Sequence, residues 1–171
     1  MFMSLNSSQT GTLTKMSRDS NKAERTRPSV DEYFMEIAEV VSKRSTCLRE
    51  QVGAVLVRDK HILSTGYNGA PAGLDHCEDV GCLRQRLKVP SGERHELCRG
   101  VHAEANAIIQ AALHGVNTED STMYCTHQPC SMCTKMAINA KVKEIVFRVP
   151  YPDALSLELL RDAKIGIRRL Q

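Results

Sequence analysis

The pattern of apolar positions predicts a helix near residue 30 and a β-hairpin directly after it. Ser29, with Glu32 three residues later, forms a capping box, which is a signature of a helix start. Apolar residues then recur at helical spacing and give this helix one apolar face: Phe34, Ile37, Val40 and Val41. The apolar run 52–57 and the segment 61–65, with turn residues between them, predict the two strands of the hairpin.

Beyond residue 101, helical and extended patterns alternate. Helices are predicted over 102–115, 130–140 and around 155–160, and strands over 121–126, 144–149 and 165–169. Such alternation favours a sheet, mostly parallel after its hairpin, with helices on both faces. The predicted fold class is therefore α/β: a three-layer α/β/α domain with a five-stranded mixed sheet.

Two segments fall outside this alternation. Residues 1–27 are polar and lack apolar periodicity, so we predict a disordered N-terminal tail there and one domain over 28–171. Residues 70–101 form a long polar insert that carries three Cys, two His and several Arg. About 30 residues without periodicity inside a compact domain need a separate source of order.

Composition narrows the class of protein. No apolar run approaches the length of a membrane span, so we expect a soluble protein without a membrane partner. The net charge of +3 is compatible with a small anionic substrate and too weak to indicate a nucleic-acid partner. The seven cysteines are odd in number and no secretory signal precedes them, so we expect a cytoplasmic, metal-binding protein rather than a disulfide scaffold.

The candidate chemistry lies at two predicted helix starts. The sequence His-Ala-Glu at 102–104 opens one helix, and Pro-Cys-Ser-Met-Cys at 129–133 opens the next. Cys130 and Cys133 are three residues apart, so both thiols face the same way at a helix start. Together with His102 they supply three zinc ligands and leave one tetrahedral position open, as catalytic zinc sites do.

Glu104 completes the chemistry of this cluster. Zinc acidifies a water in the open position to hydroxide near neutral pH. Glu104 follows His102 too closely to be another ligand on the same helix face, and we predict that it shuttles protons from the water to a ring nitrogen and to departing ammonia. An H-x-E motif combined with P-C-x-x-C is the signature of zinc-dependent nucleobase deaminases.

At these residues the sequence resembles the cytidine and deoxycytidylate deaminase superfamily, and within it the deoxycytidylate (dCMP) deaminases. The similarity extends from about residue 27 to 166 and includes the segments 44–47, 52–55, 66–71, 98–104 and 126–130. The resemblance implies a cytidine-deaminase-like fold and the hydrolysis of dCMP to dUMP and ammonia, which feeds thymidylate synthesis. It also assigns His102, Cys130 and Cys133 to zinc and Glu104 to proton transfer.

The resemblance extends to binding and regulation. It implies that Asn68 contacts the sugar or base, since an amide both donates and accepts hydrogen bonds. For the 5′-phosphate we expect Arg44 and Ser45, just before the first strand. Because the family is activated by dCTP and inhibited by dTTP in hexamers, we expect a homohexamer that binds nucleotide effectors, with Mg²⁺ accompanying the nucleotide.

The cysteines of the insert suggest a second metal. A structural zinc would explain how the insert stays ordered, because metal binding supplies folding free energy directly. Members of the resembling family can carry a second zinc in this region, so five candidates compete for four ligand positions: Cys47, Cys77, Cys82, His95 and Cys98. The alternative is that these thiols are free.

Two other functions fit parts of the pattern. A tRNA adenosine deaminase shares the His-Ala-Glu and Pro-Cys-x-Met-Cys motifs, but the loop 66–71 and the cysteine-bearing insert favour the nucleotide enzyme. A non-catalytic zinc-binding module of a larger assembly would use the same ligands without needing Glu104. Substitution of Glu104 therefore separates the two classes of protein.

Overall fold

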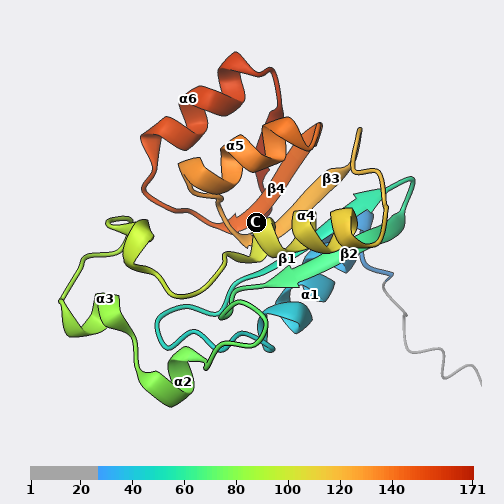
Figure 1. Cartoon of the computed structure of the whole chain (residues 1–171). Coiled ribbons are helices and arrows are strands. Elements are labelled where there is room, and N and C mark those ends of the chain that lie inside the picture. Colours follow the sequence, from blue (N-terminus) through green and yellow to red (C-terminus); the bar gives the residue numbers. More distant parts are fainter. Residues whose placement is uncertain (1–26) are drawn as a thin grey trace, which may run out of the picture.

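The computed structural model describes residues 27–171, so nearly all of the tail predicted over 1–27 lies outside the described residues. A five-stranded mixed sheet with the order β2-β1-β3-β4-β5 forms the centre of the domain (Figure 1). β1 is antiparallel to both β2 and β3, whereas β3, β4 and β5 are parallel. The strands are β1 (Gly53–Arg58), β2 (His61–Tyr67), β3 (Thr122–His127), β4 (Glu144–Val149) and β5 (Gly166–Arg169).

Helices cover both faces of the sheet, which confirms the predicted three-layer α/β/α class. One face carries α1 (Val30–Ser42), whose side chains pack against Val55, Tyr124 and Val146. The other face carries α4 (Ala103–Leu113), α5 (Ser131–Asn139) and α6 (Ala154–Asp162) (Figure 1). Alternate residues of β1 point into the two layers, because successive side chains of a strand face opposite sides.

The first helix begins where the capping box predicts. The Ser29 hydroxyl accepts the Glu32 N–H, and the Glu32 carboxylate accepts the Ser29 N–H. Its buried face differs from the prediction, however, because Val40 is 62% exposed while Met35 and Ala38 are buried. At about 3.6 residues per turn, Val40 lies on the opposite side of the helix from Met35 and Ala38.

The hairpin and its successor helix position the first half of the site. Asp59 and Lys60 form the turn with φ of 51° and 63°, as a tight two-residue hairpin requires. Gly66 on β2 lies directly against the backbone of α4, where a Cβ would stand 2.2 Å from the Ala103 carbonyl oxygen. This close approach brings the start of α4 to the end of the sheet.

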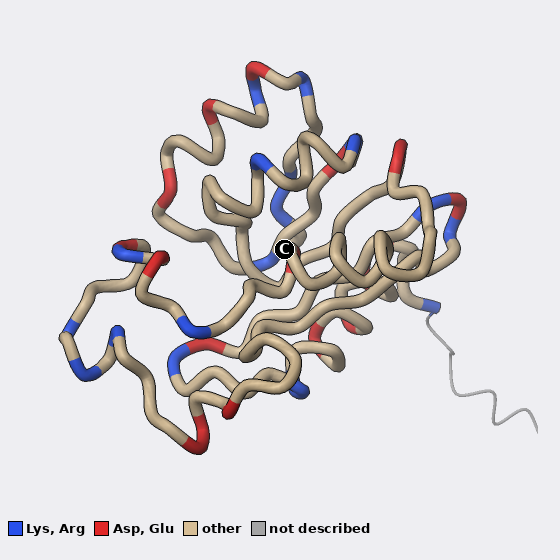
Figure 2. The backbone as a smooth tube through the Cα atoms, in the orientation of Figure 1, with Lys and Arg blue, Asp and Glu red and all other residues tan. Residues whose placement is uncertain are grey.

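The insert contains only short helices. These are α2 (Cys77–Val80), α3 (Leu83–Arg86) and the 3-10 helix η1 (His95–Leu97). An isolated bridge between Gly69 and Val101 ties its two ends together, and η1 leads back to α4. Basic and acidic residues are interspersed along the insert and the rest of the described chain (Figure 2).

Candidate functional site

Three potential metal ligands converge from two helix N-termini. His102 is the N-cap residue of α4, Cys130 is the N-cap residue of α5, and Cys133 lies in the first turn of α5. His102 Nδ1 is 3.4 Å from the Cys130 Sγ and 3.5 Å from the Cys133 Sγ. Zn–N bonds of about 2.0 Å and Zn–S bonds of about 2.3 Å give ligand separations of about 3.5 Å in a tetrahedron. Both nitrogen–sulfur separations are therefore those that a shared zinc ion would give.

Charge separation within this cluster also suits a cation. The hydrogen bond from Cys133 and the neighbouring His102 lower the pKa of the Cys130 thiol to about 4. Hydrogen bonds to Cys130 and then to Cys98 raise the pKa of the His102 imidazole to about 10, despite its burial. These shifts pair a proton on His102 with a thiolate on Cys130. A zinc ion held by these residues would replace that proton, because zinc ligands must be deprotonated.

Glu104 lies beside the same cluster. Its carboxylate oxygen, the Cys133 thiol and a His102 ring nitrogen all lie within 4.8 Å of one another. The side chain is only 4% exposed, and burial raises the pKa of its carboxyl group. A buried carboxyl with a raised pKa beside a metal site is suited to take up and release protons near neutral pH.

Contacts from α6 fix the loop that carries Cys130, and these contacts could not be predicted from the sequence, although the helix itself was. The Asp153 carboxylate accepts the Ser131 N–H at 2.7 Å and the Ser156 N–H at 3.0 Å, so it joins the N-termini of α5 and α6. The Ser156 hydroxyl donates to the Pro129 carbonyl at 2.8 Å. Because that carbonyl can only accept, Thr134 must donate its own proton to Ser156, at 2.8 Å. An Asp before a helix signals a cap, but nothing in the sequence reveals its second partner.

We expect Ser156→Ala to weaken zinc binding about 10- to 100-fold, as loss of a group that orients metal ligands typically does. The substitution leaves the Pro129 carbonyl without its partner directly beside Cys130. The measurement is zinc competition with a chromophoric chelator, alongside thermal unfolding of the metal-free protein. Ser64→Ala is a matched control, since Ser64 donates to the Ala107 carbonyl at 2.8 Å, away from the cluster. If Ser156→Ala and Ser64→Ala lost the same amount of zinc affinity, the hydrogen bond from Ser156 would not be what orients Cys130.

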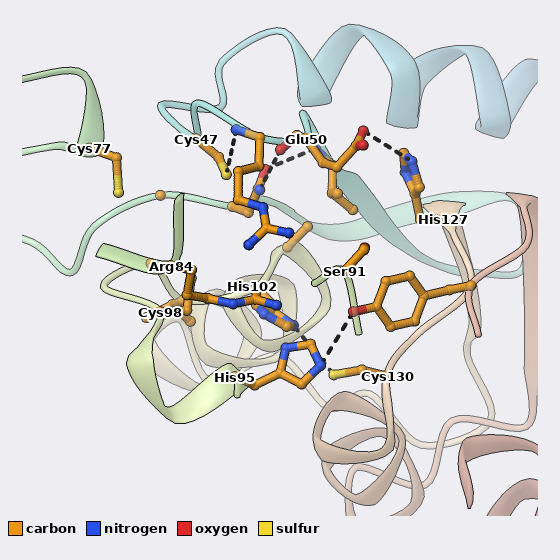
Figure 3. Close-up of a pocket in the computed structure, with 18 of the residues that line it drawn as sticks. Cys47, Glu50, Cys77, Arg84, Ser91, His95, Cys98, His102, His127 and Cys130 are labelled. Atoms are coloured by element: carbon orange, nitrogen blue, oxygen red, sulfur yellow. Dashed lines mark hydrogen bonds and ion pairs between the residues drawn. The ribbon is translucent and has the colours of Figure 1, made fainter. Parts of the chain in front are cut away.

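The metal cluster opens into a cavity of about 330 Å³. His102, Glu104 and Cys130 line it together with the insert, the last residue of β4 and the segment 150–152. Figure 3 shows His102 and Cys130 among the lining side chains. Such a volume lies at the small end of the range for ligand pockets, about 300 to 1,000 Å³. The cavity is thus of a size for one small molecule that reaches the metal.

The predicted substrate contacts differ in where they lie. Asn68 lines the cavity, with its Oδ1 accepting the Val52 N–H at 2.8 Å and its amide donating to the Glu50 carbonyl at 2.8 Å. Arg44 is exposed and Ser45 is buried, and neither is among the lining residues. The cations that line it are Arg49, Arg84 and Arg99.

The five candidates for a second metal also line the cavity, but His95 and Cys98 both lie next to His102. Burial, and then the charges of Cys47, Cys82 and Cys98, raise the pKa of the Cys77 thiol. His95 lies apart from Cys47 and Cys77, beside His102 and Cys130 (Figure 3).

The family model of the cytidine and deoxycytidylate deaminase zinc-binding region matches residues 28–149. That span is more than half of the chain and contains the two motifs around His102 and Cys130. The chain therefore belongs to the cytidine and deoxycytidylate deaminase family, a family of zinc-binding hydrolytic enzymes, and the resemblance inferred from its motifs is confirmed.

Individual relatives are similar along most of the chain. A deoxycytidylate deaminase of Mycobacterium phage D29 is 37% identical over 129 residues, which cover 71% of this chain and 95% of that protein. ComE operon protein 2 of Bacillus subtilis is 38% identical over 85% of this chain and 73% of that protein. A crystal structure of dCMP deaminase from the cyanophage S-TIM5, in complex with dCMP and dUMP, matches with a TM-score of 0.69 at 30% identity and covers 85% of this chain and 99% of that one.

Some relatives are much longer than this chain. It spans 45% of the length of the deoxycytidylate deaminases of Schizosaccharomyces pombe and Saccharomyces cerevisiae, to which it is 37% and 36% identical.

Among the described residues, no helix is both long enough and apolar enough to cross a bilayer.

Proposed function

We propose that the protein hydrolyses dCMP to dUMP and ammonia with zinc held by His102, Cys130 and Cys133. The observation that carries this proposal is the placement of two thiols, an imidazole nitrogen and the buried Glu104 carboxyl around one point that opens into a cavity. The relatives named deoxycytidylate deaminase support dCMP as the substrate.

Each residue of the cluster has a distinct role in this reaction. Zinc supplies an acidified water as the nucleophile when it is bound. Glu104 accepts the proton of that water and passes it to the pyrimidine ring nitrogen next to the reacting carbon, and then helps to protonate the departing ammonia. Glu104 must be protonated between taking the proton from water and passing it on. Burial favours this protonated form, because desolvation disfavours the carboxylate.

The rest of the nucleotide needs partners further up the cavity. Asn68 retains one free N–H and one free lone pair for the sugar or base, because an amide offers two donors and two acceptor sites. Arg44 and Ser45 stay a prediction for the phosphate, without support from the cavity lining. Arg49 is better placed, since it lines the cavity and its Nη1 is buried without a hydrogen-bond partner among the described residues.

We propose a structural zinc held by Cys47, Cys77, Cys82 and Cys98. The nearness of Cys47, Cys82 and Cys98 to the Cys77 thiol supports this choice, as does the insert that carries three of the four, because it has little regular structure of its own. His95 is left out of the set because one of its ring nitrogens lies within 4.8 Å of the His102 and Cys130 ligand atoms.

Regulation, assembly and location complete the proposal. We propose a cytoplasmic homohexamer that responds to dCTP and dTTP, with Mg²⁺ accompanying the effector. All seven cysteines lie outside disulfides, which is consistent with a reducing compartment. Exposed apolar side chains on α4 and α5 offer surface for a neighbouring copy: Ile109, Leu113, Met132 and Met136.

The test of function is ammonia release from zinc-loaded protein given dCMP, CMP, deoxycytidine or an adenosine-bearing tRNA anticodon stem. We expect turnover of dCMP, at least about 100-fold weaker turnover of deoxycytidine because a charge-assisted phosphate contact is lost, and stimulation by dCTP. Activity confined to the RNA would support the tRNA enzyme instead. Zinc-loaded protein that is inactive on all four would indicate a non-catalytic module.

A further inference from the structure

His95 is a histidine of the insert that none of the roles above uses. It begins η1, and one of its ring nitrogens lies within 4.8 Å of both the His102 and Cys130 ligand atoms. The His95 and His102 rings stand edge to face, with centroids 5.3 Å apart. Figure 3 shows His95 beside Cys130 at the base of the cavity. The insert thus brings a second imidazole to the catalytic metal cluster.

Only one of the two ring nitrogens of His95 has a hydrogen-bond partner among the described residues. Its Nε2 contacts the Tyr151 hydroxyl at 3.3 Å. Its Nδ1 is buried and has no hydrogen-bond partner among the described residues. A buried imidazole nitrogen without a partner is costly, and a metal ion bound by the neighbouring His102 and Cys130 would be a partner for the His95 ring.

The backbone before His95 is fixed by a buried cation. Arg84 is 8% exposed and donates to the carbonyls of Pro90 and Glu93. Arg94 takes a left-handed conformation with φ of 50°, which is uncommon for a residue other than glycine. These features hold the segment in the conformation that turns His95 toward the cluster.

We propose that His95 is a fourth protein ligand of the catalytic zinc in the substrate-free protein, and that substrate binding displaces it. The inference rests on the proposed zinc site of His102, Cys130 and Cys133. Ligands of one tetrahedral zinc stand about 3.5 Å apart, and a His95 nitrogen lies within 4.8 Å of two of them, so a small movement brings it into place. On displacement, the bond from imidazole nitrogen to zinc breaks and water takes the vacated position, with no change in oxidation state.

The insert lies outside the packed core, so the His95 side chain can exchange although Arg84 anchors the backbone before it. Neither α2, α3 nor η1 packs extensively on the sheet or on the longer helices, whereas the helices that carry the other ligands are in the core. His95 can therefore leave the metal without disturbing His102 or Cys130. In this scheme only the form in which His95 has left the metal accepts substrate. The apparent affinity for substrate is therefore the intrinsic affinity multiplied by the fraction of protein in that form.

The test replaces zinc by Co²⁺ and compares absorption spectra of the wild-type protein and His95→Ala, each with and without dUMP. We expect the substrate-free spectra to differ, and dUMP to bring the wild-type spectrum toward that of the variant. His127→Ala is the matched control, because His127 lines the cavity but belongs to neither group of candidate metal ligands. Signals from cobalt elsewhere in the chain cancel in the difference spectra.

Kinetics give a second readout. If His95 competes with substrate for the metal, His95→Ala lowers KM about 3- to 10-fold with little change in kcat, and it speeds zinc loss to a chelator. Identical cobalt spectra, or a fall in kcat with KM unchanged, would overturn the proposal. If His95→Ala does not fold, the wild-type response to dUMP and the His95→Gln variant decide the same question. Cobalt spectra unaffected by Cys130→Ser would show instead that the proposed zinc site itself is wrong.

Discussion

Glu104→Gln is expected to reduce turnover of dCMP by about 10²- to 10⁴-fold, the contribution typical of a general acid–base group. Glutamine has nearly the same shape, but its amide cannot accept the water proton or release one to ammonia. The zinc content is expected to stay unchanged, because the three proposed ligands are His102, Cys130 and Cys133. The measurements are ammonia release and zinc per chain on the same preparation.

The control for this substitution is Glu119→Gln. Glu119 forms a surface ion pair with Lys141, at 2.6 Å, and takes no part in the cluster. The control should retain both zinc and turnover. If Glu104→Gln also retained turnover, the proton shuttle would have to be another group. If Glu104→Gln abolished turnover but left the biological role of the protein intact, the protein would be a non-catalytic zinc-binding module.

Local patterns were sufficient where neighbouring residues decide the structure. The capping box at Ser29, the turn at Asp59 and Lys60, and the helix starts at His102 and Cys130 are all determined by nearby side chains. The motifs around His102 and Cys130 could be predicted to lie close together, because each comes at the start of a helix next to the sheet. Their separation in sequence gave no obstacle, since β2 and β3 are both antiparallel to β1 and therefore end at the same edge of the sheet, where the two helices start.

Tertiary contacts decide what local patterns could not. Val40 was assigned to the buried face because it is apolar at a helical spacing, but the sheet contacts Met35 and Ala38 instead. The insert has no periodicity, so its sequence could not show that His95 and Cys98 lie next to His102. The bonds from Ser156 join residues far apart in the chain and leave no mark in the sequence.

The second large effect is expected from Cys130→Ser, which should remove the catalytic zinc and abolish turnover. A serine hydroxyl remains protonated near neutral pH and is a poor zinc ligand, whereas the environment of Cys130 holds its thiol ionised with a pKa of about 4. Cys125→Ala is the control for loss of a buried thiol, because Cys125 lies within β3 and does not line the cavity. The measurements are zinc per chain and ammonia release.

Cys77→Ser, measured in the same way, separates the two proposed metals. If both sites are real, wild-type protein holds about two zinc ions per chain, and each of the two Ser variants holds about one. Cys130→Ser should be inactive but keep an ordered insert, whereas Cys77→Ser should keep the catalytic zinc and measurable turnover with a lower unfolding temperature. A wild-type value near one removes the structural site. Turnover retained in Cys130→Ser would remove Cys130 from the catalytic ligands, and with it the reason for placing the reaction at the start of α5.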